Sequence, residues 1–248
     1  MLRAQGLTLY EPGDLRGESA FSGGADLRRI ATWAVDFLNA PHPQLGRRGP
    51  VCPYTRLSMD NHGFLLAWAG GEHDIASIES TVEKYRRWFM EMLERSETGR
   101  EHLLTILVVL PGLDPTDPGP LDALQGRLKD AFVCEGLMVG QFHPRCTQSG
   151  LWNEDFRPLR APVPLLAIRR MVPSDLPFLL DSADHLLAYL DRFAPNIPGH
   201  VRRLLVARTM QASGHDRVTV EWRACGGTGC GWPTAAGRTA SSSAPATS

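Results

Sequence analysis

Residues 136–170 contain the densest group of side chains in this chain that could do chemistry. An apolar stretch at 137–142 is followed by His143-Pro144 and then by a polar loop. Together they supply an imidazole, a thiol, an indole and three guanidinium groups, from His143, Arg145, Cys146, Trp152, Arg157 and Arg160. Because binding and catalytic residues concentrate in loops at strand ends, this loop is the predicted functional site.

His143 is the candidate metal ligand, haem ligand or general base. The predicted strand before it would anchor its backbone, and Pro144 disfavours a helical conformation at His143. The alternative is a partly buried histidine that is hydrogen-bonded to the backbone and takes part in no reaction. The sequence leaves both interpretations open.

Arginines predict an anionic ligand near this histidine. Guanidinium groups grip carboxylate or phosphate through paired hydrogen bonds, so a substrate carboxylate, a phosphate or haem propionates would suit them. The arginines concerned are Arg145, Arg157, Arg160, Arg169 and Arg170. The alternative is a set of surface arginines together with a buried structural pair to Asp155 or Asp175.

The five cysteines are odd in number and irregularly spaced, which in a reducing compartment predicts free thiols. Cys52-Pro53 could be a haem contact, with an ordinary free thiol before a proline turn as the alternative. Cys225 and Cys230 suggest zinc, but only His215 lies nearby in the sequence and a second ligand pair is missing. We therefore expect unstructured thiols there.

The elements that must position these residues follow from the apolar pattern. Strands are predicted at 63–69, 103–110, 137–142 and 163–168, and the two runs at 103–110 and 163–168 are apolar enough to be interior strands. Helices are predicted at 26–38 with Asp26 as its cap, from Asp74, around 121–132, from Ser174 to 193, and at 198–210.

This alternation predicts an α/β or α+β fold, with one mixed sheet of about four or more strands flanked by helices. We expect a flexible arm at 1–23, a single globular domain at 24–222 and a disordered tail at 223–248. The tail is rich in Gly, Ala, Ser and Thr and lacks apolar periodicity.

Composition excludes several classes of partner. The chain has 26 Lys+Arg against 27 Asp+Glu, so a general attraction to nucleic acid or to an anionic membrane is not expected. No apolar run approaches the roughly 20 residues that span a bilayer, and no secretory leader is recognisable, which predicts a cytoplasmic protein. The expected partner is an anionic or amino-acid-like small molecule, and a homodimer is left open.

Three segments resemble an actinobacterial family of domains without assigned function, often encoded among natural-product genes. They are Cys52-Pro53, LVVLPG at 107–112 and FRPLRAPVPLLAIRRMVPSDLPFL at 156–179. The order of features is more distantly similar to the YqcI/YcgG family. That family has a cysteine in an early loop, a central apolar strand, a strand that ends in His-Pro and an arginine-rich run before another strand.

Some YqcI/YcgG members look like haem-dependent enzymes that N-oxygenate amino or guanidino groups. The resemblance, which covers about residues 50–180, implies that His143 is the axial ligand of haem iron. It implies that the cofactor or substrate is held by Arg145, Arg157, Arg160 and Cys52, although CPYTR at 52–56 lacks the Phe-rich flanks of the family. The expected function is therefore a haem-binding oxidative enzyme of specialised metabolism, with a non-enzymatic protein that binds an anionic small molecule or a partner protein as the alternative.

Overall fold

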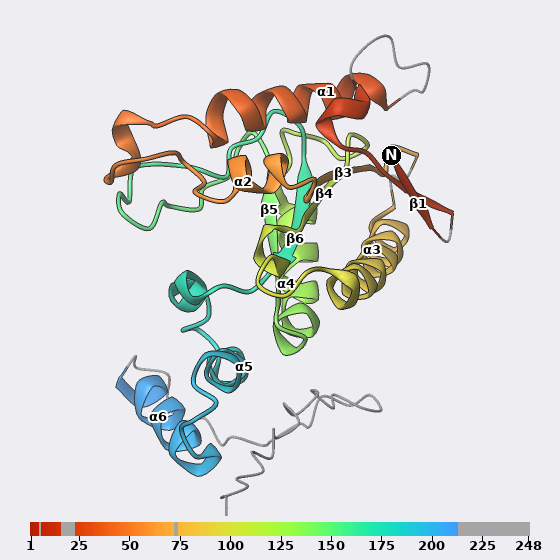
Figure 1. Cartoon of the computed structure of the whole chain (residues 1–248). Coiled ribbons are helices and arrows are strands. Elements are labelled where there is room, and N and C mark those ends of the chain that lie inside the picture. Colours follow the sequence, from red (N-terminus) through yellow and green to blue (C-terminus); the bar gives the residue numbers. More distant parts are fainter. Residues whose placement is uncertain (5, 16–22, 72–73, 213–248) are drawn as a thin grey trace, which may run out of the picture. The chain divides into compact units, whose positions relative to one another are not determined.

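The fold is built on a four-stranded mixed sheet. The computed structural model describes residues 1–4, 6–15, 23–71 and 74–212 (Figure 1). The strand order is β3-β4-β6-β5, with bounds Phe64–Trp68, Thr105–Val109, Leu165–Arg170 and Leu137–Phe142. β3 is parallel to β4, and β6 is antiparallel to both of its neighbours. The carboxyl ends of β3, β4 and β5 therefore lie along one edge, which we call the carboxyl edge.

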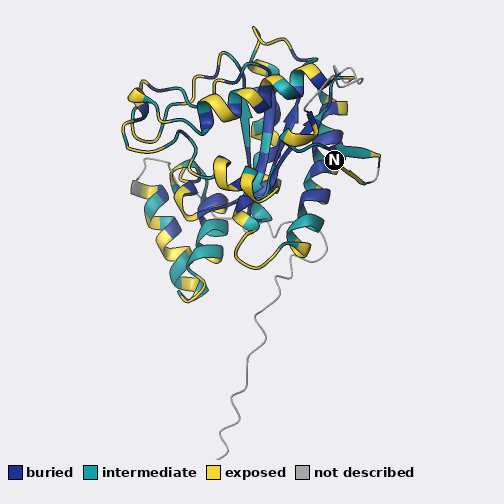
Figure 2. Cartoon of the chain, turned by 45° about the horizontal axis from the view of Figure 1, so that its top comes forward, coloured by how far each residue is buried: buried dark blue, intermediate teal, exposed yellow. Residues whose placement is uncertain are grey.

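Both faces of the sheet are covered, and the two central strands are apolar over Ile106–Val109 and Leu165–Ile168. In β4, Ile106 and Val108 face a cluster built with α3 (Ile75–Arg95) and α4 (Gly119–Cys134). Leu107 and Val109 face a second cluster built with α1 (Gly24–Trp33). The strands are accordingly the most deeply buried elements in Figure 2. This confirms an α/β fold in which β4 and β6 are both interior strands.

The helices follow the apolar periodicity closely. Asp74 accepts a hydrogen bond from the backbone N–H of Ser77 at 3.0 Å and so caps α3 as predicted. α1 continues directly into a π-helix over Ala34–Leu38. The other helices are α2 (Thr55–Asp60), α5 (Ala183–Phe193) and α6 (Gly199–Ala212). No helix in the described part of the chain is both long and apolar enough to cross a bilayer.

Two predicted helix starts are wrong. Asp26 lies in the first turn of α1 rather than at its cap, and its carboxylate accepts a hydrogen bond from the Trp68 indole at 3.4 Å. Ser174 belongs to a short 3-10 helix over Pro173–Phe178 and caps nothing. The true cap of α5 is Ser182, whose hydroxyl accepts from the backbone N–H of His185.

Residues 2–15 do not form the loose arm that their glycines suggested. β1 (Leu2–Ala4) and β2 (Leu7–Leu9) make an antiparallel hairpin around Gly6. Tyr10 then exchanges two backbone hydrogen bonds with Leu66, at 2.9 and 2.8 Å. The segment is therefore held against the edge of β3. The glycine is a turn residue, since it adopts φ +78°. The predicted tail at 223–248 lies outside the described residues.

β6 begins and ends two residues later than predicted. Val163 and Pro164 precede the strand, and the Pro164 carbonyl accepts the backbone N–H of Leu110. Arg169 and Arg170 are consequently inside the sheet, where they lie opposite Thr105 and Leu137. The loop between β5 and β6, residues 143–164, returns to the carboxyl edge at both of its ends. We call it the site loop.

Candidate functional site

His143 lies at the carboxyl edge as the first residue after β5. Its side chain continues the alternation of β5 towards α4, and the residue is 2 % exposed. Its Nε2 lies 3.1 Å from Oδ1 of Asp122, which is in the first turn of α4. Its Nδ1 is also buried, and it has no hydrogen-bond partner among the described residues. In the tautomer with hydrogen on Nε2, the ring donates to Asp122 and keeps a lone pair on Nδ1.

A second buried histidine, in α5, also binds an aspartate of α4. Nε2 of His185, in α5, lies 2.8 Å from Oδ1 of Asp130, and its Nδ1 is buried without a partner in the described structure. Burial lowers the pKa of His185 and outweighs the hydrogen bond to Asp130, which acts to raise it. This pair joins α5 to α4. A His–Asp pair on α4 therefore does not by itself identify a reactive group.

The three arginines of the site loop donate to backbone carbonyls. Arg145 donates to Thr116 at 3.2 Å, Arg160 donates to Cys146 at 3.2 Å, and Arg157 donates to Phe156 and Glu154. Within the described residues, none of the three forms an ion pair with a carboxylate. Their positive charges are therefore uncompensated by direct contact, and Arg145 and Arg160 are exposed.

Cys146 lies among these charged groups. The thiol is free and buried, and its pKa is raised, first by that burial. The charges of Asp122, Arg160 and Arg157 also act on it, which places all three near the sulfur. A raised pKa favours the thiol over the thiolate, so Cys146 is not set up as a nucleophile or as a thiolate ligand. The structure thus places Asp122, which contacts His143, together with Arg157 and Arg160 around a buried thiol.

Cys52 does not belong to this group. Its thiol is free and half-buried, and its backbone N–H donates to the Leu38 carbonyl. The Cys52 side chain is close enough to Arg169 to act on the charge of that arginine. Arg169 and Leu165 are four residues apart in β6, and Leu165 lies opposite Phe142. Four residues of a strand span roughly 13 Å, so Cys52 and His143 lie towards opposite ends of the strands.

The expectation of free thiols is wrong for Cys134, which is disulfide-bonded.

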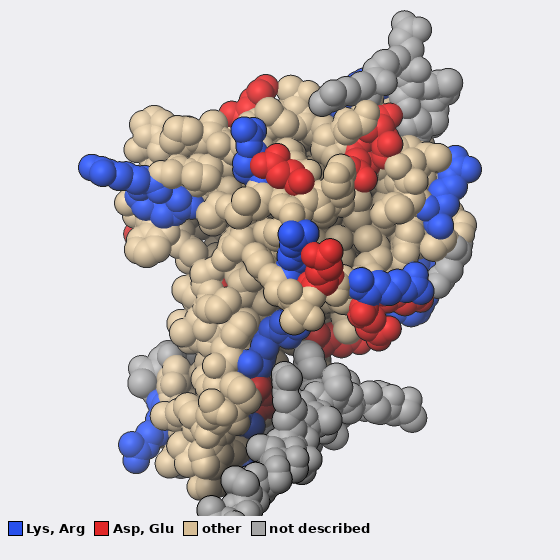
Figure 3. Space-filling model, viewed as in Figure 1, with Lys and Arg blue, Asp and Glu red and all other residues tan. Residues whose placement is uncertain are grey.

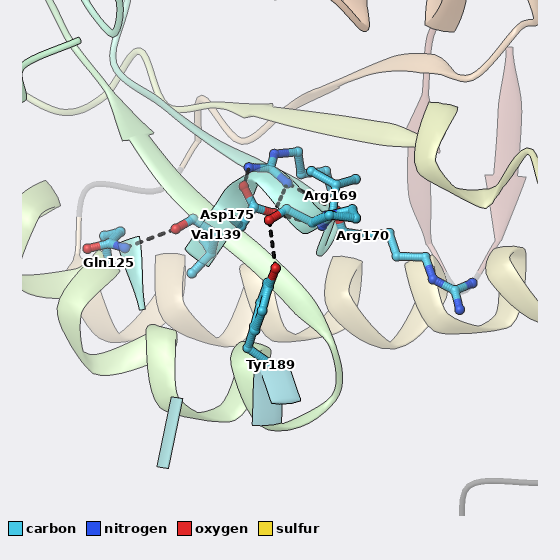
Figure 4. Close-up of polar contacts among 8 residues, drawn as sticks. Gln125, Val139, Arg169, Arg170, Asp175 and Tyr189 are labelled. Atoms are coloured by element: carbon cyan, nitrogen blue, oxygen red, sulfur yellow. Dashed lines mark hydrogen bonds and ion pairs between the residues drawn. The ribbon is translucent and has the colours of Figure 1, made fainter. Parts of the chain in front are cut away.

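Arg169 is a structural residue, as the alternative interpretation held. Its guanidinium binds both carboxylate oxygens of Asp175, at 2.7 and 2.5 Å, and Asp175 also accepts the Val172 backbone N–H (Figure 4). Burial is the largest influence on the pKa of Arg169 and lowers it, but the hydrogen bonds and negative charge of Asp175, together with Cys52 and Tyr54, raise the pKa overall. The neighbouring Arg170 is 3.7 Å from Glu101. These two arginines are not part of the site at the carboxyl edge.

No metal cluster accompanies the site. The described residues contain no group of three or more His, Cys, Asp or Glu side chains that could hold an ion. The zinc interpretation concerned His215, Cys225 and Cys230, which lie outside the described part of the chain. Asp122 is the site residue that the sequence did not reveal. It is 21 positions from His143 and sits in an ordinary amphipathic helix.

Comparisons with known proteins returned one match. A family model described as a domain of unknown function, DUF6875, matches residues 27–204. This range includes the whole sheet, α4 and the site loop. No curated protein matches the chain, and no solved structure matches it.

Proposed function

The chain belongs to the DUF6875 family, and because the description of that family assigns no activity, we propose a function from the local geometry: this protein binds an anionic small molecule at the carboxyl edge. The observation that carries the proposal is the set of three site-loop arginines without carboxylate partners in the described structure. Guanidinium groups bound only to carbonyls keep further N–H donors for a ligand.

The surroundings of these arginines support an anion. α4 begins at Gly119 on the same edge, and the first turn of a helix carries partial positive charge. Ligands of open α/β sheets bind outside the carboxyl ends of the strands, where loops from several strands meet. Arg145 joins two such loops through its bond to Thr116. An amino-acid-like substrate with a carboxylate would meet these requirements.

Arg160→Gln should weaken binding of inorganic phosphate and of glutamate about tenfold or more, because a hydrogen bond to a charged group contributes roughly 1.5–3 kcal/mol. Isothermal titration calorimetry of the full chain measures the loss directly. Arg100→Gln is the matched control, since Arg100 is exposed and pairs with Glu97 at 3.1 Å, away from the site loop. Equal affinities for wild type and Arg160→Gln, or no heat from either anion, would contradict the proposal.

Haem is a second candidate, in line with the resemblance to N-oxygenase-like members of the YqcI/YcgG family. The observation in its favour is the His143 ring, in which a carboxylate binds one nitrogen and the other keeps an unpartnered lone pair. Metal-bound histidines are commonly oriented by such a carboxylate. In this interpretation His143 would hold the iron through Nδ1, and Arg145, Arg157 and Arg160 would hold the propionates. When bound, haem would supply oxidative chemistry on an amino-acid-like substrate.

His143 is buried, so the haem proposal requires that haem can reach its ring. A haemin titration tests this. If haem binds there, adding haemin to the full chain should shift its absorption spectrum to that of a histidine-ligated haem, and His143→Ala should abolish the shift. His185→Ala is the matched control, because the His185 ring likewise binds an aspartate, Asp130, through Nε2 and has a buried Nδ1 without a partner in the described structure. A spectrum of free haemin in wild type, or an equal effect of both variants, rules out this role of His143.

A further inference from the structure

An exposed apolar tip lies on the site loop and is used by neither candidate function. Leu151 and Trp152 are 49 % and 66 % exposed, the latter the most exposed large hydrophobic side chain in the described chain. The tip lies beside residues 42–50, the two segments forming the neighbouring loops at the left of Figure 1. An exposed indole of this kind is typical of a binding contact, since tryptophan is enriched among the residues that dominate interface energies.

The backbone under this tip is held by close contacts. The Asn153 side chain donates to the Gln44 carbonyl at 2.8 Å. Gly46 has φ +78°, and a Cβ there would lie 2.5 Å from the Trp152 carbonyl oxygen, so glycine is required. Phe156 is buried and stacks on His42 with ring centroids 4.7 Å apart. The indole is thus presented from an ordered backbone, and little backbone freedom is left to lose when a partner binds.

Charges of both signs surround the tip. Arg48 is exposed on one loop, and Glu154 and Asp155 are exposed on the other. In the described structure none of these three side chains forms an ion pair. Basic side chains project from this pair of loops in Figure 3. Exposed charges of both signs beside an apolar tip allow two copies related by a two-fold rotation to place opposite charges against each other.

We propose that the Leu151–Trp152 tip is the centre of a homodimer interface, in which Arg48 of each copy faces Glu154 and Asp155 of the other. The mixed charge argues against a polyanion or an anionic lipid surface, because the two carboxylates would repel either one. The two apolar side chains of each copy would remove those of the other from water. Two-fold pairing is the commonest way in which soluble chains assemble.

Sedimentation velocity of the full chain across a dilution series tests the proposal. Wild type should dimerise, and Trp152→Ala should raise the dissociation constant tenfold or more. Leu57→Ala is the matched control, because Leu57 is 51 % exposed on α2, outside the two loops. Circular dichroism shows whether each variant is folded. A monomeric wild type at all concentrations, or a Trp152→Ala protein that dimerises as wild type does, overturns the proposal.

Variants with reversed charges distinguish a dimer formed through these residues from a dimer formed through another surface. Arg48→Glu makes the patch wholly acidic, and Glu154→Arg with Asp155→Arg makes it wholly basic, so each variant alone should be monomeric. A mixture of the two should form a heterodimer, because each pair of facing charges is again opposite in sign. If the mixture stays monomeric while wild type dimerises, the interface lies elsewhere and this assignment is wrong.

Discussion

Val108→Asp should leave little folded protein. Val108 is fully buried in the middle of β4, between Ala67 of β3 and Leu166 of β6 in the register of the sheet. The described residues around it are apolar side chains of the cluster under α3 and α4, so a carboxylate there would have neither water nor a cation. An unpaired buried charge costs several kcal/mol, roughly 3–5, against a total stability of about 5–15 for a typical domain.

Urea denaturation followed by circular dichroism measures this effect, provided that some folded variant can be purified. The matched control is Val35→Asp, the same substitution at an exposed valine in the π-helix, which should change stability by about 0.5 kcal/mol or less. A soluble Val108→Asp protein with the urea midpoint of wild type would show that β4 is not an interior strand.

Arg169→Ala should be the second most damaging substitution. Asp175 is 2 % exposed, and Arg169 supplies two of its three hydrogen bonds, so removing the guanidinium leaves a buried carboxylate with one backbone N–H. About a third of the Arg169 side chain is exposed, so we base the estimate on the carboxylate. Removing one partner of a buried pair costs roughly 3–5 kcal/mol.

Arg170→Ala provides the comparison for this position. Its partner Glu101 is 3.7 Å away and both side chains are partly exposed, so a loss of about 1 kcal/mol or less is expected. The double variant Arg169→Met with Asp175→Leu should be more stable than Arg169→Ala, because no buried charge remains. If Arg169→Ala and Arg170→Ala lower the urea midpoint equally, the Arg169–Asp175 pair is not a buried structural contact.

The sheet could be predicted from the sequence because its signals are local. The run at 103–110 is apolar at every position except Thr105, which is typical of a strand with both faces covered. Asp74 is followed by an amphipathic pattern and caps the helix that the pattern predicts. The hairpin at residues 2–9 was missed because two three-residue strands are too short to show a period, and its support from Leu66 is distant in the sequence.

The sequence suggested a candidate site but not how its residues contact one another. His143 was found from its place after a predicted strand. Its partner Asp122 was not, because the contact depends on how α4 packs against β5. The arginines show the same limit: Arg169 and Arg160 have similar sequence surroundings, yet one meets a buried carboxylate and the other meets carbonyls. Whether an arginine is structural or available depends on which acidic side chain the tertiary fold brings within reach.

The strand order has a consequence for the growing chain on the ribosome. β6 is the last of the described strands to be synthesised, yet it lies between β4 and β5. Until residue 170 has emerged, β4 is paired only with β3, and β5 lacks its partner in the sheet. At about 5–20 residues per second, the 28 residues that follow Phe142, up to Arg170, take a few seconds. During that interval two apolar strand edges are open to pairing with other nascent chains. The length of the site loop therefore also sets how long these two strand edges stay open during synthesis.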